Sequence, residues 1–131
     1  MNSSLVTIVY VNDSAAAARF YGELLGISPS FEVPGYVAFD LGPGADLALW
    51  ELAARRQLPG ADEFEKLSPD LPRTSEVCLA IDGGHEELDA VFQQWVSKGV
   101  NILHEPKDAG FGRTFLAADP DGNRIRVAPQ D

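Results

Sequence analysis

The sequence is poor in the residues on which several common classes of protein depend. It has one cysteine and two histidines in 131 residues, which excludes an internal disulfide and cysteine-rich zinc sites. No apolar run approaches the roughly 20 residues that cross a bilayer. The first residues, Met-Asn-Ser-Ser, lack the basic and apolar regions of a signal peptide. We therefore expect a cytoplasmic protein that makes no membrane contact.

Positive charge is also scarce. Ten lysines and arginines face twenty aspartates and glutamates, which gives a formal net charge of −10. Such a surface repels phosphate backbones, so we expect no nucleic-acid partner. The hydrophobic fraction of 45% with 23% charged residues is typical of a globular chain, and the length suits a single domain. Because basic side chains are few, their positions are informative.

The first half of the chain predicts a strand, a helix and three further strands. Residues 5–11 are rich in β-branched and aromatic residues, as buried strands are. Asn12, Asp13 and Ser14 supply helix N-cap chemistry, and Gly26 is a natural helix end. The predicted elements are a strand at 5–11, a helix at about 15–25 with Ala16, Phe20 and Leu24 on one face, a short strand around Phe31, and strands at 36–41 and 46–52.

The second half repeats this order. Its predicted elements are a strand at 76–81, a helix at about 86–98 that Gly99 ends, and strands at 101–105, 113–118 and 123–128. The polar segment 53–74 is interpreted as a linker with a helical turn at 62–67. The predicted fold is α+β, with tandem βαβββ modules at about 1–52 and 75–131 inside one domain, 1–131. The helices cover the outer face of a cupped mixed sheet.

Strand alternation sorts side chains between the helix-covered face and the concave face of this sheet. It places Tyr10, Trp50, Glu76 and Arg126 on the concave face. Trp50 has the alternative of core or dimer-interface packing, and Arg126 that of a solvated edge charge. Cys78 is interpreted as a buried small apolar residue.

Other aromatic and histidine residues are weaker candidates. Phe31, Tyr36 and Phe39 suit either structure or ligand stacking, and Phe111, which lies between glycines, suits the cover of a cleft mouth. His85 and His104 are interpreted as solvated or interface residues, because neither has metal-ligand or catalytic spacing to another histidine. The sequence has no glycine-rich phosphate loop and no nucleophile elbow.

The repeat, the segment Phe-Tyr-Gly-Glu-Leu-Leu-Gly at 20–26 and the turn Asp-Pro-Asp-Gly-Asn at 119–123 resemble the vicinal oxygen chelate superfamily. This group includes glyoxalase I, bleomycin-resistance proteins and extradiol dioxygenases, and the resemblance implies a homodimer. Its enzymes bind a metal through His, Glu or Gln. Those positions fall here on Val6, Glu76 and Arg126, and near Trp50–Glu51. The resemblance therefore implies no metal and no cofactor, with a Glu76–Arg126 ion pair in the place of the ion.

Within the superfamily, several blocks resemble the phenazine-antibiotic resistance proteins. They include 36–39, 48–50, Phe-Gly-Arg-Thr-Phe-Leu at 111–116 and Ile-Arg-Val at 125–127. That family holds a flat carboxylated drug, chemically unchanged, in an aromatic pocket at the dimer interface. By position, the resemblance implies ligand contacts from Phe39, Trp50, Phe111 and Arg113, while Arg126 or Arg113 would meet a drug carboxylate.

The predicted function is therefore non-catalytic sequestration of a planar aromatic antibiotic. Two alternatives stay open at this point. One is a metal-dependent enzyme of the superfamily, such as a glyoxalase-type lyase, a thiol transferase or a dioxygenase. The other is an accessory protein that binds a different metabolite.

Overall fold

The structure is a computed structural model that describes residues 5–57, 76–109 and 112–129. The predicted helical turn at 62–67 and the candidate Phe111 lie outside these residues. Backbone contacts divide the chain into two compact units, Met1–Arg73 and Thr74–Asp131. Each unit is described by itself.

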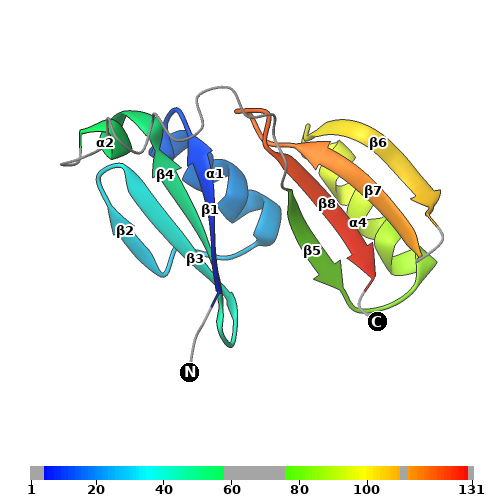
Figure 1. Cartoon of the computed structure of the whole chain (residues 1–131). Helices are drawn as coiled ribbons and strands as arrows, with labels where there is room; N and C mark the ends of the chain where they lie inside the picture. Colours follow the sequence, from blue (N-terminus) through cyan, green and yellow to red (C-terminus); the bar gives the residue numbers. More distant parts are fainter. Residues whose placement is uncertain (1–4, 58–75, 110–111, 130–131) are drawn as a thin grey trace. The chain divides into compact units, whose positions relative to one another are not determined.

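The first unit is a four-stranded mixed sheet with a helix on one face (Figure 1). Its elements are β1 (Leu5–Val11), α1 (Ser14–Leu25), β2 (Phe31–Val33), β3 (Tyr36–Gly42), β4 (Ala45–Glu51) and α2 (Leu52–Arg56). The strand order is β1-β4-β3-β2. β1 runs parallel to β4, and the other neighbours are antiparallel. The predicted linker thus begins with a short helix, in keeping with the helix propensity of its alanines and arginines.

The second unit repeats this topology. Its elements are β5 (Val77–Ile81), α4 (His85–Ser97), β6 (Asn101–Asp108), β7 (Arg113–Ala118) and β8 (Arg124–Pro129). The strand order β5-β8-β7-β6 matches the first sheet position by position, with β5 parallel to β8. The predicted α+β fold with tandem βαβββ modules is therefore confirmed, as two four-stranded mixed sheets. The homodimer stays a prediction.

The two ends of α1 follow the predicted chemistry, but its buried face does not. The Asp13 carboxylate accepts a hydrogen bond from the Ala16 amide at 3.1 Å, and Gly26 ends the helix in the left-handed region at φ 70°. The buried residues include Ala17, Tyr21 and Leu24, so the predicted face through Ala16 and Phe20 is wrong by about one residue. At the start of α1 the Ser14 amide donates to Glu51 Oε2 at 2.9 Å, which ties this end of the helix to the end of β4.

Each sheet buries one face under its own helix; the other face, which no described helix of the same unit covers, we call the open face. Under α1, the buried residues include Val37, Phe39, Leu47 and Leu49. Under α4, they include Phe115, Ile125 and Val127, which face the buried Leu88 and Trp95 side of the helix. The Trp95 and Phe115 rings meet edge to face with centroids 5.2 Å apart. Because alternate strand residues point to opposite faces, the residues between these core positions populate the open faces.

Candidate functional site

The open face of the first sheet carries a row of aromatic rings. Tyr10 pairs with Trp50 across β1 and β4, and Trp50 pairs with Tyr36 across β4 and β3. Ring centroids are 6.2 Å apart for Tyr10–Trp50, 6.1 Å for Trp50–Tyr36 and 6.2 Å for Phe31–Tyr36. Tyr10 and Phe31 are exposed to 40% and 55%. We call these four residues the aromatic row; each of the four strands of the sheet contributes one of them.

Phe39 does not belong to this row. Its side chain is 0% exposed, and its register partner Leu47 is also in the core under α1. The expectation that Phe39 contacts a ligand is therefore corrected: it is a core residue. The physical reason is strand parity, since Phe39 is an odd number of residues from Tyr36 and points to the opposite face.

The open face of the second sheet carries a polar network centred on Arg126. Its Nε donates to Glu76 Oε1 at 2.5 Å, and its Nη1 donates to Thr114 Oγ1 at 3.3 Å. The Thr114 hydroxyl gives its own proton to the Val127 carbonyl at 2.7 Å, which leaves its lone pairs to accept from Arg126. The predicted Glu76–Arg126 ion pair is confirmed. The network fixes the plane of the guanidinium, a group that suits carboxylate recognition.

Arg113 points to the other side of its sheet. Its Nε donates to Asp89 Oδ1 on α4 at 2.8 Å, and this hydrogen bond raises the pKa of the Arg113 guanidinium. Arg113 lies one residue from Thr114 and therefore faces the helix, as Phe115 does. The expectation of a ligand contact from Arg113 is corrected, because this side chain ties β7 to α4.

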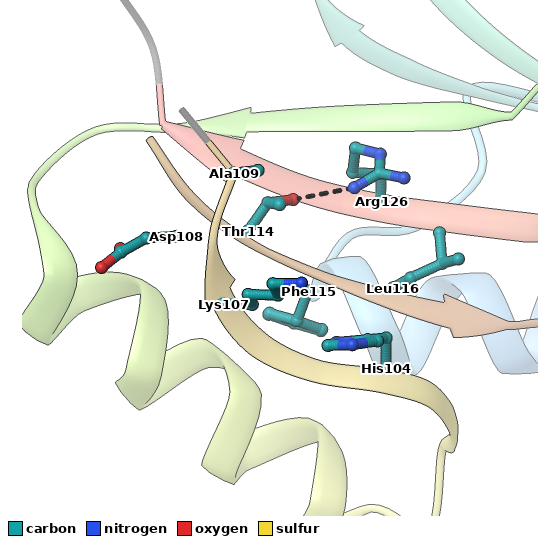
Figure 2. A pocket seen from close by; sticks show the side chains of 8 residues that line it. All are labelled: His104, Lys107, Asp108, Ala109, Thr114, Phe115, Leu116 and Arg126. Atoms are coloured by element: carbon teal, nitrogen blue, oxygen red, sulfur yellow. Dashed lines mark hydrogen bonds between the residues drawn. The ribbon is translucent and has the colours of Figure 1, made fainter. Parts of the chain in front are cut away.

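A cavity of about 360 Å³ lies beside Arg126, within the second unit. Figure 2 shows Arg126 and Thr114 on one side of it and Lys107 and His104, both from β6, on the other, with Leu116 between them. In the same view Asp108 lies away from the guanidinium, toward α4. Strand alternation does not predict the place of Lys107, because register shifts at Ile102/His104 and at His104/Lys107 break the alternation in β6.

Cys78 is exposed on the same open face, in register with Arg126. The prediction that it is buried is wrong, because Val77 takes the buried position in β5 and Cys78 takes the opposite one. Partial desolvation by its neighbours, and then the negative charge of Glu76, raise the pKa of the Cys78 thiol, while Arg126 opposes them. A raised pKa disfavours the thiolate, so this cysteine is a poor nucleophile.

Comparison with known proteins identifies the family. Residues 4–127 match the model of the Glyoxalase/Bleomycin resistance protein/Dioxygenase superfamily. The chain belongs to this superfamily. It is 35% identical over 127 residues to the phenazine antibiotic resistance protein EhpR of Enterobacter agglomerans, which covers 95% of this chain and 89% of that protein.

Two solved structures of this fold are similar along nearly the whole chain. Protein ATC0852 of Agrobacterium tumefaciens has 32% identity and a TM-score of 0.73, covering 100% of this chain and 99% of that one. A glyoxalase-related enzyme of Fulvimarina pelagi has 25% identity and a TM-score of 0.71, covering 99% of this chain and 89% of that one.

None of the helices in the described ranges is long and apolar enough to cross a membrane.

The residues at the expected metal positions of the superfamily do not fit a chelated cation. Val6 has no donor atom, and Arg126 brings a positive charge that already engages Glu76. Glu51 accepts a hydrogen bond from the Ser14 amide at the start of α1. Across 5–57, 76–109 and 112–129, no three His, Cys, Asp or Glu side chains gather as a metal site. The Glu76 and Glu51 carboxylates, which a metal would need as ligands, are therefore already engaged, the first by Arg126 and the second by the start of α1.

Proposed function

We propose that this chain binds a planar aromatic, carboxylated antibiotic of the phenazine type and protects by sequestering it unchanged. The observation that carries the proposal is the aromatic row on the open face of the first sheet. The 35% identity to a phenazine antibiotic resistance protein supports the same ligand class.

The aromatic row suits a flat ring system. Tyr10, Trp50 and Tyr36 offer an apolar surface with polar edges, and each aromatic pair adds roughly 0.5–1.5 kcal/mol beyond the burial of area. Phe31 extends the surface at the edge of the sheet and is more than half exposed. Covering these rings removes them from water, which is the main driving force for an apolar ligand.

Within the second unit, Arg126 is proposed as a binding position for a carboxylate. A chain with a net charge of −10 repels anions in general, so an anionic ligand needs local positive charge. Among the described residues, Glu76 and Thr114 use Nε and Nη1 of Arg126 and leave other guanidinium N–H groups to donate. No cofactor enters this proposal, because sequestration requires binding alone.

Protection then follows from mass action. A drug that is bound does not act, so resistance scales with protein abundance and with affinity. The proposal includes a cytoplasmic location, so that the drug is bound inside the cell. It also includes a homodimer.

Fluorescence quenching by phenazine-1-carboxylate tests the proposal. We expect saturable quenching in the wild-type protein and at least about tenfold weaker binding of the ligand to Trp50→Ala, because the central ring of the row is lost. Trp95→Phe is the matched control, since Trp95 is buried under the second sheet, and it should retain the affinity. The absence of saturable binding across a panel of planar aromatic acids would sink the proposal.

The enzyme alternative has its own test. The similarity to a glyoxalase-related enzyme motivates assays with the hemithioacetal of methylglyoxal and glutathione in the presence of nickel or manganese. We expect no turnover above the rate without protein, because Val6 and Arg126 stand where metal ligands are needed. Metal-dependent turnover would overturn the non-catalytic part of the proposal.

A further inference from the structure

The cavity beside Arg126 brings two basic side chains of the second unit together. Arg126 and Lys107 bring positive charge to it from two different strands, although the chain has only ten basic residues against twenty acidic ones. Two carboxylates lie nearby: Glu76 pairs with Arg126, and Asp108 is turned away from the guanidinium, toward α4 (Figure 2). The four charges balance, so the site depends on geometry: Lys107 and the Arg126 N–H groups that Glu76 and Thr114 leave over are the donors that it offers to an anion.

The strand register explains how the two cations come to one place. Lys107 pairs with Thr114 across β6 and β7, and opposite residues of an antiparallel pair point to the same face. Thr114 in turn holds Arg126 through its hydroxyl group. The register shifts in β6 bring Lys107 onto this face.

The walls of the cavity are apolar between these charges. Leu116 and Ala109 line it; Phe115 also borders it, although its ring packs against Phe92 and Trp95 of α4. Its volume of about 360 Å³ lies in the range of small-molecule sites. Two cations with an apolar wall between them match an organic acid better than an inorganic anion, because an inorganic anion leaves the apolar wall without a partner.

The geometry points to a carboxylate-binding site in the second unit, in which Arg126 and Lys107 hold the acid group of a small aromatic acid and Thr114 positions Arg126. This inference rests on the proposed function for the identity of the natural ligand. It adds Lys107 as the residue that distinguishes acids from neutral molecules with the same rings.

The test compares phenazine-1-carboxylate with unsubstituted phenazine, which shares its rings and lacks the acid. Lys107 is exposed, so Lys107→Gln should fold normally. We expect it to weaken phenazine-1-carboxylate binding about three- to fivefold, because an exposed ion pair contributes up to about 1 kcal/mol. The binding of phenazine, which has no charge, should not change. Lys98→Gln removes the same charge at the end of α4 and should change neither affinity. Equal effects of Lys107→Gln on both ligands, or no effect on either, would overturn the inference.

A second arm separates this inference from the proposed function. If neither phenazine compound binds the wild-type protein, the proposed function fails, and benzoate is titrated into isotope-labelled protein. Saturable NMR shifts at Thr114 and Leu116 that Lys107→Gln weakens would support the carboxylate site by itself. Unchanged spectra up to tens of millimolar benzoate would overturn it.

Discussion

Neutralising Glu76 should weaken the fold and strengthen the binding of acids. Glu76→Gln keeps an oxygen that can accept from Arg126 Nε and removes the negative charge. The two side chains are 31% and 28% exposed, so their pair lies between the surface and the buried cases. Exposed pairs contribute about 0.2–1 kcal/mol, while breaking buried pairs costs about 3–5 kcal/mol. We expect a loss of about 1 kcal/mol in the free energy of unfolding, or roughly 3–5 °C in Tm for a chain of this size.

The gain in affinity follows from Coulomb's law. A ligand carboxylate on Arg126 would share the guanidinium with Glu76 at a separation of about 6 Å, where two like charges repel by about 0.7 kcal/mol in water and about 2.8 kcal/mol at an effective dielectric constant of 20. Removing one charge should therefore tighten the binding of phenazine-1-carboxylate by at least about threefold. Unsubstituted phenazine carries no charge, and its affinity should not change.

Thermal denaturation measures the loss of stability, and calorimetric titration at low and high ionic strength measures the affinity for both ligands. The gain for the acid should shrink in 0.5 M salt, because salt screens a partly exposed charge. Glu86→Gln, on the exposed first turn of α4, is the control for a change in net charge alone. Unchanged or weaker acid binding in a folded Glu76→Gln protein would refute the reasoning. It would mean that the charge of Glu76 is needed to orient Arg126, and that Glu76 does not compete for it.

Two further predictions concern the thiol and the last turn. The raised pKa of the Cys78 thiol predicts slow alkylation by iodoacetamide near neutral pH, with a rate that rises at a higher pH than for free cysteine. In Glu76→Gln this rise should come at a lower pH than in the wild-type protein, because one cause of the raised pKa is removed. A wild-type rate that rises at the pH of free cysteine or below it would contradict this. Asp119 is 3% exposed and accepts hydrogen bonds from the Asp121 and Asn123 amides and from Asn123 Nδ2. Asp119→Ala should cost about 2–3 kcal/mol of unfolding free energy in thermal denaturation, and a loss no larger than that of the partly exposed neighbour Asp121→Ala would refute the structural role of the turn.

The sequence determined the repeated fold because its signals are local. β-Branched runs, the cap at Asp13 and the glycine at position 26 each act within a few residues, and the same order of elements occurs twice. The Glu76–Arg126 pair was predictable as well, since matching the strands of the repeat to a known family placed both residues at one site.

Only the tertiary structure decided which side chains reach the open faces. Phe39 and Arg113 have suitable chemistry, but strand parity turns the first into the core and the second toward Asp89 on α4. Glu51 accepts a hydrogen bond from the Ser14 amide at the start of α1, although the two residues are 37 positions apart in the sequence. Lys107 reaches the cavity through bulges that shift the register of β6. Composition and periodicity depend on neighbours along the chain, whereas register, bulges and long-range caps depend on how whole strands pack, so these residues could be placed only in three dimensions.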